Sequence, residues 1–437
     1  MPTLTPAWLS SQLQKPLPTW LLIGIVVRVV IAPWIGHFYD LRTWMVVGAA
    51  VAQGHSPYEF YVVWNYFPNV HVHLFGDPTG VLPGIGYPPL WGILLGLLYD
   101  ISYAMTHNLY VYTFALKAPV LIGDVAFALL LRKVVAEHAG ERIGDLAGTA
   151  WFLNPFVILA GTAWGMFDSL PLFFILLSIY ALSRGSWKAS ALYLALANEF
   201  KPIGLVLVLL FCAYLWRKGS PRRSLSYVLL TGGAFLVLTY GLMLGLGWPL
   251  SNFMASQTYQ LSGVIGAGSL FIAWIAASYA LTGSAPYYIT GLLGVLWVPA
   301  VAAASLYYFY RVRDLSFRSL VLWSLIAVSL SYATRTFVTE TQFVIPLALL
   351  LVLESTTDGS KRLFEILSAI MAAFLVIHVP ISQFLWIGLP NVVAWTTAFA
   401  TSPFWGSVRW IASTVLIYAY TLVLFGFLIR RWHMKAG

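Results

Sequence analysis

The chain has 437 residues, of which 60% are hydrophobic and 9% are charged, and its mean hydropathy is +0.82. This composition excludes a soluble globular protein and indicates an integral membrane protein with several helical spans. The net charge of +9 does not indicate a nucleic-acid partner, because most of the 24 lysines and arginines fall into short clusters between apolar runs. The single cysteine, Cys212, excludes an internal disulfide and a cysteine zinc site.

The basic clusters set the predicted topology. Cytoplasmic loops carry an excess of lysine and arginine, so we place every cluster and both termini on the cytoplasmic side. The clusters are Lys15; Arg132, Lys133 and Arg142; Arg184 and Lys188; Arg217, Lys218, Arg222 and Arg223; Arg311, Arg313 and Arg318; Lys361 and Arg362; Arg430, Arg431 and Lys435. The predicted spans then lie near residues 19–37, 109–131, 146–163, 168–184, 225–247, 285–310, 318–334, 341–354, 364–387 and 408–429. The first of them carries Arg28 and no small-residue cleavage site, which predicts a retained helix and not a signal peptide.

Some apolar segments do not fit a simple crossing. LALANEFKPIGLVLVLL lies between two inside clusters, and each half is short for a bilayer of about 30 Å, so Lys201-Pro202 predicts a broken hairpin. A full crossing by 84–104 would place Arg132 outside, so we predict a re-entrant or membrane-surface element there and, similarly, at 269–281. The main outer loops are then 38–83 and 248–284. MVVGAAVAQG in the first loop predicts a short amphipathic helix on the interface, ended by Gly54.

A second set of charges is not explained by topology. These residues are the cations Arg28, Arg42, Lys117, Lys201, Arg335 and Arg409, and the acids Asp40, Glu59, Asp77, Asp100, Asp124, Asp168, Glu199 and Glu340. Most map to the outer half of the membrane or its outer surface. One explanation is a set of ion pairs that hold helices together, such as Glu199 with Lys201. Charges that converge from different helices in one leaflet favour a shared polar cavity instead.

The order of motifs resembles a known family. HFYDLRTWMVVGAAVAQGHSPYEF resembles the stretch after the first helix in polyprenyl-phosphate-sugar-dependent glycosyltransferases of the GT-C fold, including bacterial polyprenyl-phosphate-mannose mannosyltransferases. YPPLWGILLGLLY, LKAPVLIGDVAFALLLRK, WFLNPFVILAGTAWGMFDSLPLFFILLSIYAL and EFKPIGLVLVLL resemble, in order, the catalytic subunit of GPI mannosyltransferase I and its archaeal relatives. The resemblance covers residues 20–216. The GPI enzyme carries a D-x-D pair after its first helix, whereas this chain has His37 and Asp40 without a second acid.

The resemblance implies roles for individual residues. Asp40 matches the family's catalytic acid and is expected to be the base that takes the acceptor proton. Lys117 and Lys201 match family lysines and are expected to bind the donor phosphate; Arg335 joins them on its predicted outer position alone. Asp124 is expected to be a helical or interhelical partner of Lys117. The further substrate-binding candidates are His37, Asp168, Glu340, Tyr87 and His378.

Other signals have plainer interpretations. His71 and His73 alternate with valine as metal ligands on a strand would, but without a third clear ligand an aromatic-rich surface loop is favoured, and we expect no metal site. His378 lies within a predicted span and is more often a hydrogen-bonded helix contact. Trp64, Tyr66 and Trp164 could stack on sugars, although most aromatics indicate interface belts. No Walker A or G-x-G-x-x-G motif follows a strand, which argues against a nucleotide-sugar donor.

We therefore predict an all-α polytopic membrane protein with a GT-C-type bundle of about 10–13 spans and short amphipathic helices in the first outer loop. Residues 1–437 form one domain, with a catalytic module at 20–216 and more variable helices at 217–437. The expected activity is inverting transfer of a hexose, in the first place mannose, from a polyprenyl or dolichyl phosphate to a lipid-linked or extracytoplasmic acceptor, without a cofactor. The expected location is the plasma membrane of a prokaryote or the endoplasmic reticulum of a eukaryote. The alternatives are a polar-lipid transporter or flippase, and a non-catalytic subunit of the same fold.

Overall fold

The computed structural model describes residues 18–67, 81–261, 264–283, 286, 288–289, 291–379, 398 and 402–436. These residues are mostly helical, as expected. The α-helices are α2 (Thr19–Ile31), α3 (Phe38–Ala52), α4 (Val63–Tyr66), α6 (Pro89–Asp100), α7 (Tyr103–Thr106), α8 (Leu109–Ala139), α9 (Glu141–Phe152), α10 (Pro155–Ile158), α11 (Ser169–Ser183), α12 (Trp187–Phe200), α13 (Val208–Arg217), α14 (Pro221–Gly245), α15 (Leu250–Leu261), α16 (Ile272–Thr282), α17 (Gly291–Gly294), α18 (Trp297–Arg311), α19 (Phe317–Thr334), α20 (Val344–Thr357), α21 (Arg362–His378) and α23 (Pro403–Ala436). A π-helix, η1 (Leu159–Ala163), two 3-10 helices, η2 (Pro202–Leu207) and η3 (Glu340–Phe343), and an antiparallel strand pair, β1 (Tyr61–Val62) and β2 (Val81–Leu82), complete them.

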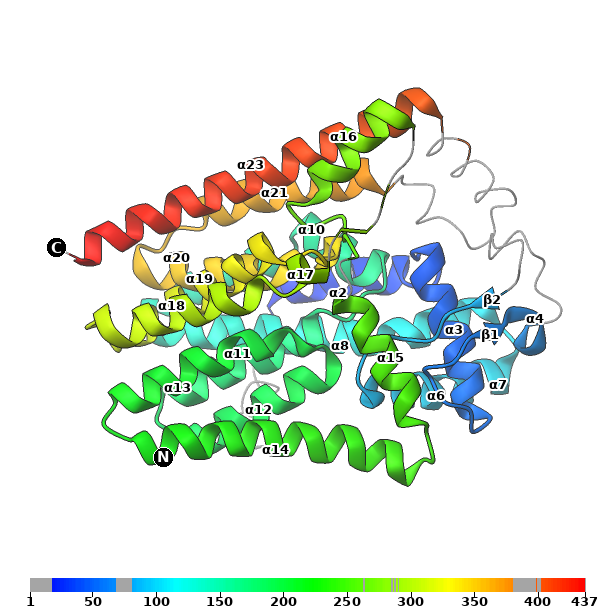
Figure 1. Cartoon of the computed structure of the whole chain (residues 1–437), viewed down its shortest axis with the longest axis horizontal. Helices are drawn as coiled ribbons and strands as arrows, with labels where there is room; N and C mark the ends of the chain where they lie inside the picture. The colour runs from blue at the N-terminus through cyan, green and yellow to red at the C-terminus, as the bar shows by residue number, and fades with distance from the viewer. Residues whose placement is uncertain are drawn as a thin grey trace.

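The bundle has two chemically different ends. One end carries the basic clusters, and we call it the basic end (Figure 1). It contains the connections α8–α9, α11–α12, α13–α14, α18–α19 and α20–α21 and the end of α23. Helices α3, α6, α7 and α15 and the two strands lie at the opposite end, the loop end (Figure 1). This arrangement agrees with the alternation of spans that the basic clusters predict.

The chain is an integral, multi-pass membrane protein. Five described helices are long and apolar enough to cross a bilayer, namely Leu109–Ala139, Pro221–Gly245, Gly291–Arg311, Phe317–Thr334 and Phe404–Arg431. The pair Glu141–Phe152 and Pro155–Ala163, bent by 48°, would make a sixth span. Four further helices are apolar but shorter than these spans, namely Thr19–Ile31, Ser169–Ser183, Pro202–Arg217 and Ile272–Thr282. The expected total of about 10–13 spans stays a prediction, and parts of the predicted spans 285–310 and 364–387 lie outside the described residues.

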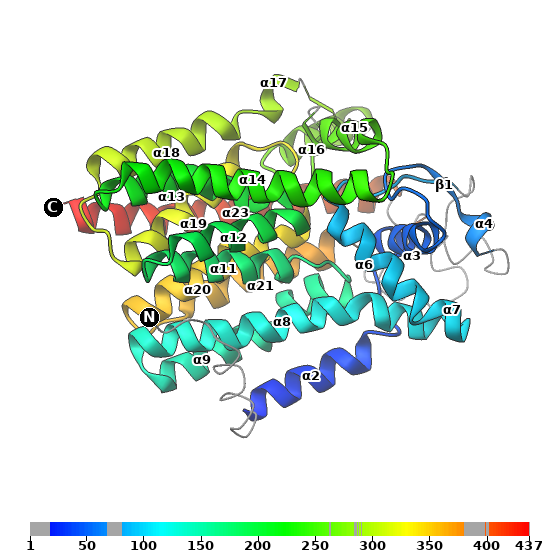
Figure 2. The same ribbon diagram turned by 90° about the horizontal axis from the view of Figure 1, so that it is seen from below.

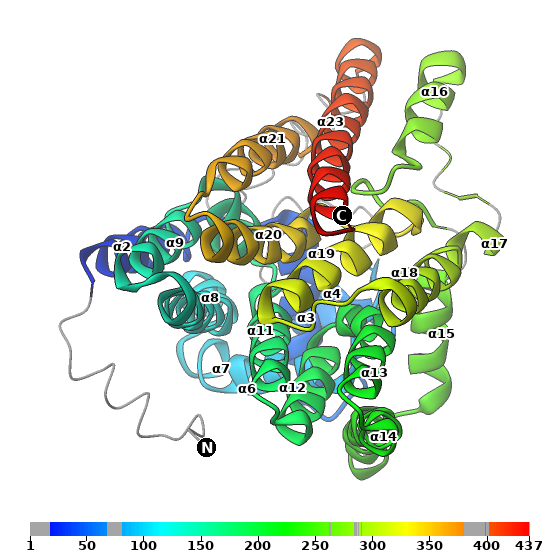
Figure 3. The same ribbon diagram turned by 90° about the vertical axis from the view of Figure 1, so that its left-hand side faces the viewer.

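Central and peripheral helices differ in burial. Viewed from the basic end, α11, α19 and α20 lie near the middle of the bundle, while α2, α14 and α16 lie at its edge (Figure 3). Accordingly, 78% of the apolar 18-residue stretch of α19 is buried inside the bundle, against 17% of the corresponding stretch of α14. Apolar side chains at the edge, such as Val237 at 71% exposure, then face lipid without a hydrophobic penalty.

The predicted break at Lys201-Pro202 is confirmed. Helix α12 ends at Phe200, Lys201 has extended backbone angles (φ −155°, ψ 124°), and η2 begins at Pro202. Proline lacks an N–H donor and disfavours helical angles in the residue before it, so the helix must end there. The two halves, α12 and α13, both pack against α14 (Figure 2).

Helix α3 forms where the first loop predicts it, but its environment differs from the expectation. Residues 41–50 are all buried, so α3 is packed within the loop end and does not expose one face to solvent. It lies against α6 through small residues: a Cβ at Gly48 would lie 2.8 Å from the Leu95 carbonyl oxygen, and one at Gly96 would lie 2.7 Å from Val51 Cγ1. Helix α6 therefore stays at the loop end beside α3, in agreement with the non-crossing element predicted at 84–104 (Figure 1).

Candidate active site

The segment Trp164–Asp168, between η1 and α11, joins two polar centres at the loop end. The indole Nε1 of Trp164 donates to Asp40 Oδ2 at 2.6 Å, and Asp168 Oδ1 lies 2.6 Å from Lys201 Nζ. Between them, Gly165 has a φ of +97°, and a Cβ at this position would lie 3.3 Å from Lys117 Cε. The turn thus requires glycine both for its backbone conformation and for space. π-helices such as η1 often occur at functional sites, where they change the direction of the chain.

Both donors that hold Asp40 bind the same oxygen. Besides Trp164, His37 Nδ1 lies 2.9 Å from Oδ2, and the rings of His37 and Trp164 stack with centroids 4.1 Å apart. The Oδ1 atom of Asp40 has no hydrogen-bond partner among the described residues, and the side chain is 22% exposed. One carboxylate oxygen is therefore fixed and the other can receive a ligand.

These distances indicate which hydrogen bond His37 Nδ1 makes. The Asp40 backbone N–H lies 3.4 Å from Nδ1, a contact that needs an unprotonated Nδ1, whereas the 2.9 Å contact to Oδ2 needs an Nδ1–H donor. The shorter, charge-assisted bond is the stronger, so Nδ1 donates to the carboxylate. Burial favours the neutral acid, but the influence of His37, of the Trp164 donor and of Lys201 outweighs it, and the pKa of Asp40 is lowered.

The second centre is built around Lys201. Its ammonium pairs with Asp168, whose Oδ2 accepts a hydrogen bond from Thr341 Oγ1 at 2.7 Å. The rings of Tyr87 and Phe167 lie 5.5 and 5.7 Å from Nζ. Burial, together with the negative charges of Asp40 and Asp168, raises the pKa of Tyr87, so its hydroxyl remains a proton donor.

Lys201 and Arg335 line one small cavity. Its other walls come from Tyr87, Phe337, Thr339 and Gln342, and its volume is about 20 Å³. This space holds little more than one water molecule, so a phosphate group would have to displace a wall. The structure thus brings together two of the three predicted phosphate-binding cations.

Lys117, the third predicted cation, does not line this cavity but lies beside the Trp164–Asp168 segment. It is 1% exposed, and its ammonium donates to the carbonyl oxygens of Ile35 and Ala163. These bonds connect α8 to the chain before α3 and to η1, which are the segments next to His37 and Trp164. In this structure Lys117 supports the chain segments that carry His37 and Trp164.

A third polar group borders Asp40. His378 Nε2 lies 3.5 Å from Glu340 Oε1, and His378 Nδ1 lies 3.1 Å from Ser413 Oγ. Burial raises the pKa of Glu340, and the nearby charge of Asp40 adds to the effect, although His37 and Arg409 oppose it. Because Thr341 bonds to Asp168, the short helix η3 links this group to the Lys201 centre.

One predicted pairing is wrong, and one considered as an alternative does not form. Asp124 binds Arg28 Nε at 3.1 Å and is not a partner of Lys117, because α2 packs against α8 and buries the guanidinium between them. Glu199 accepts a hydrogen bond from Thr239 at 2.5 Å and does not pair with Lys201. Both acids therefore serve helix packing, and the predicted charges do not all share one cavity.

The structure adds contacts that the sequence did not predict. Trp164, named above as a side chain that could stack on sugars, donates to Asp40. Thr341 and Ser413 were not predicted; the position of Thr341 beside Glu340 was a signal, whereas nothing in the sequence marks Ser413. In the described part of the chain no group of three or more His, Cys, Asp or Glu residues could hold a metal ion. Asp77, His71 and His73 lie outside it.

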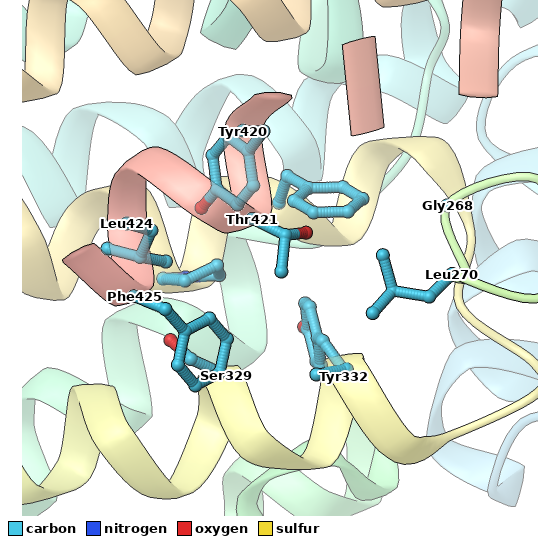
Figure 4. Close-up of a pocket in the computed structure, with 11 residues that line it drawn as sticks. Gly268, Leu270, Ser329, Tyr332, Tyr420, Thr421, Leu424 and Phe425 are labelled. Carbon is cyan, nitrogen blue, oxygen red and sulfur yellow. The ribbon is translucent and has the colours of Figure 1, made fainter. Parts of the chain in front are cut away.

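An apolar pocket lies on the other side of η3. Figure 4 shows Tyr332 and Ser329 of α19 facing Tyr420, Leu424 and Phe425 of α23 across this space. Phe343 lines this pocket, whereas its neighbour Gln342 lines the cavity of Lys201 and Arg335. A polar and an apolar space, each of about 20 Å³, thus adjoin the same short helix. Neither could admit a lipid head group or tail without movement of its walls.

Fold and site together define a multi-pass helical membrane protein with a partly exposed carboxylate and buried cations at one end of the bundle. A family whose model is described as "GPI transamidase subunit PIG-U" matches residues 87–300. Over 143 residues the chain is 26% identical to GPI mannosyltransferase 1 of Candida albicans, which confirms the resemblance to that protein. The match covers 29% of this chain and 36% of the relative, so the chain spans about a third of its length. A crystal structure of ArnT from Cupriavidus metallidurans bound to undecaprenyl phosphate is 13% identical, with a TM-score of 0.45 over 94% of this chain and 76% of that one.

Proposed function

We propose that the protein is a membrane-embedded glycosyltransferase that moves a hexose from a polyprenyl phosphate to a lipid-linked or extracytoplasmic acceptor. The observation that carries the proposal is Asp40, which has one oxygen fixed by two donors and the other open. The similarity to a protein named GPI mannosyltransferase 1 supports mannose as the hexose. The site residues predicted at the sequence level remain part of the proposal.

In the proposed reaction Asp40 acts as the general base. Its Oδ1 accepts the proton of an acceptor hydroxyl while the hydroxyl oxygen attacks the anomeric carbon of the donor sugar. The new bond forms as the bond from that carbon to the phosphate oxygen breaks, which inverts the configuration. The lowered pKa keeps Asp40 ionised throughout the neutral range and so able to accept a proton.

Lys201 and Arg335 would stabilise the leaving group. Charge builds on the phosphate oxygen as the bond breaks, and fixed cations in a poorly hydrated site stabilise that charge more than the ground state. Lys201 is already paired with Asp168, so the donor phosphate would share this ammonium or displace the carboxylate. Tyr87 and Gln342 line the same cavity and would donate to phosphate or sugar oxygens. The polyprenyl chain would lie beyond η3, where the apolar pocket of about 20 Å³ would have to widen to admit it, with its phosphate on the other side of η3.

A non-catalytic subunit is the second candidate, and one observation favours it. The family model described as a GPI transamidase subunit matches from residue 87 onward and therefore omits Asp40 and its helix. The contacts of His37 and Trp164 favour the enzyme instead, because they fix one oxygen of Asp40 and leave the other oxygen of this partly exposed carboxylate open to a ligand.

Reconstituted protein decides among the candidates. Purified protein in liposomes would receive polyprenyl-phosphate-mannose and a lipid-linked acceptor, with product and lipid movement both measured. Glycosylated product is the expected result. Lipid movement without product would establish a transporter, and neither activity with the chain alone would favour a subunit.

A further inference from the structure

A groove at the basic end lies far from the candidate active site. It is bounded by the α20–α21 connection, the first turns of α21 and the last turns of α23, and its volume is about 530 Å³. Figure 3 views this end directly, with α21 and α23 side by side above α20. None of the residues proposed to act on the sugar donor lines it.

The walls of the groove are apolar and open. Leu363 and Ile366 come from α21, and Leu422 and Val423 come from α23. Leu422 is 71% exposed and Ile366 45% exposed. Gly426 lies on the same face of α23, where an added Cβ would meet no atom within 4 Å. The groove is open and its walls are apolar, which suits the burial of an acyl chain.

The rim of the groove is cationic. Arg362 from α21 and Arg430 and Arg431 from α23 line it. Arg431 pairs with Asp358 at 2.7 Å, whereas Arg362 and Arg430 are exposed and have no ion-pair partner in the described part of the chain. Two uncompensated guanidinium groups from different helices therefore border one apolar space.

The acids at this rim do not neutralise these arginines. Glu354 is buried and accepts the backbone N–H groups of Leu363 and Phe364, at 3.1 and 2.9 Å, at the start of α21. Glu365 pairs with Lys361 at 2.8 Å. Asp358, as described, is bound to Arg431.

We propose that this groove binds an anionic glycerophospholipid from the leaflet at the basic end. The positive-inside rule explains why arginines lie at this face, but it does not explain an apolar groove directly beneath two unpaired ones. Basic pockets between helices at this membrane face suit anionic head groups, and guanidinium groups bind phosphate oxygens in pairs. The lipid phosphate would contact Arg362 and Arg430, and one acyl chain would lie between α21 and α23.

Thermal unfolding of the full-length, detergent-purified protein tests the proposal with phosphatidylglycerol, phosphatidylcholine or inorganic phosphate added. A ligand that binds only the folded protein raises the Tm. We expect phosphatidylglycerol to raise it and the other two to leave it unchanged. In R362Q/R430Q the apparent Kd for phosphatidylglycerol, from the same titration, should rise about tenfold or more, as the loss of two charge-assisted contacts implies.

Two further variants keep the test specific. R222Q/R223Q removes two arginines from another cluster at the same face and should retain the response to phosphatidylglycerol. Gly426→Leu fills the groove and keeps every charge, and it should weaken the lipid response. Equal responses to phosphatidylglycerol and phosphatidylcholine, a response to inorganic phosphate alone, an equal loss in R222Q/R223Q, or no effect of Gly426→Leu would overturn the proposal. Should R362Q/R430Q not fold, Gly426→Leu and the lipid comparison still decide it.

Discussion

The two ends of the molecule use charge in opposite ways. In the candidate active site at the loop end, Lys201 and Asp168 are buried, at 4% and 3% exposure, and pair across helices. At the basic end the pairs are partly exposed and mostly close in sequence, as in Lys361 with Glu365 and Arg132 with Glu141. A buried charge loses its hydration and must be compensated, whereas an exposed pair contributes little to stability. Buried charges, which are costly to desolvate, therefore indicate function or essential packing. Exposed charges, which cost little, indicate which side of the membrane a loop occupies.

The largest expected effect concerns Lys201. Lys201→Met should lower turnover at saturating donor about 10²-fold, because it deletes the cation at the leaving phosphate. It should also destabilise the protein by about 3–5 kcal/mol, because Asp168 remains buried without its partner. Donor-saturation kinetics and thermal unfolding measure the two effects.

A double variant separates these effects. K201M/D168N removes both charges and should recover much of the stability but none of the activity. Recovery of sugar transfer in the double variant would show that Lys201 only holds Asp168 in place.

The Arg28–Asp124 pair is the matched contrast, since it is buried but neither residue is hydrogen-bonded to Asp40 or Lys201. Asp124→Asn should destabilise the protein by about 3 kcal/mol, because the guanidinium of Arg28 loses its counter-charge. Turnover per folded molecule should stay within about twofold of the wild type, because no transition-state contact is lost. A much larger loss, measured on folded protein, would place Asp124 in the reaction.

The pH profile tests the clamp on Asp40. His37 and Trp164 lower the pKa of Asp40, so in the wild type the base form persists as the pH falls into the ordinary carboxylate range. Trp164→Phe keeps a ring against His37 but removes the Nε1 donor, which should raise that pKa. The acid limb of kcat/KM should then move to higher pH, and His37→Gln should move it in the same direction. A limb that does not move in either variant would assign it to another group.

The contrast between the two ends also explains what the sequence could predict. The break at Lys201-Pro202 and the glycine after α3 follow from local backbone chemistry, and the basic clusters follow from their separation by apolar runs. The partners of Asp124 and Glu199 depend on which helices pack together, and nothing in the sequence encodes that directly. The bond from Trp164 to Asp40 depends on the π-helix η1 and on the left-handed Gly165, so the sequence revealed the acid but not its clamp.

The smallest expected effect concerns the basic end. Lys361→Gln breaks an exposed pair between the N-cap residue and the first turn of α21, which is worth less than about 1 kcal/mol. Thermal unfolding should therefore show almost no change, and sugar transfer none. A destabilisation as large as that of Lys201→Met would remove the distinction drawn between the two ends.

The most direct test of the account is sugar transfer by Asp40→Asn. The substitution keeps the size of the side chain and the oxygen that accepts from Trp164, but it removes the base. With purified protein, polyprenyl-phosphate-mannose and acceptor, we expect a folded variant whose turnover is lower by about 10²-fold or more at neutral pH. Turnover near that of the wild type would contradict the assignment of Asp40 as the base, and with it the central claim that the loop end is a catalytic site.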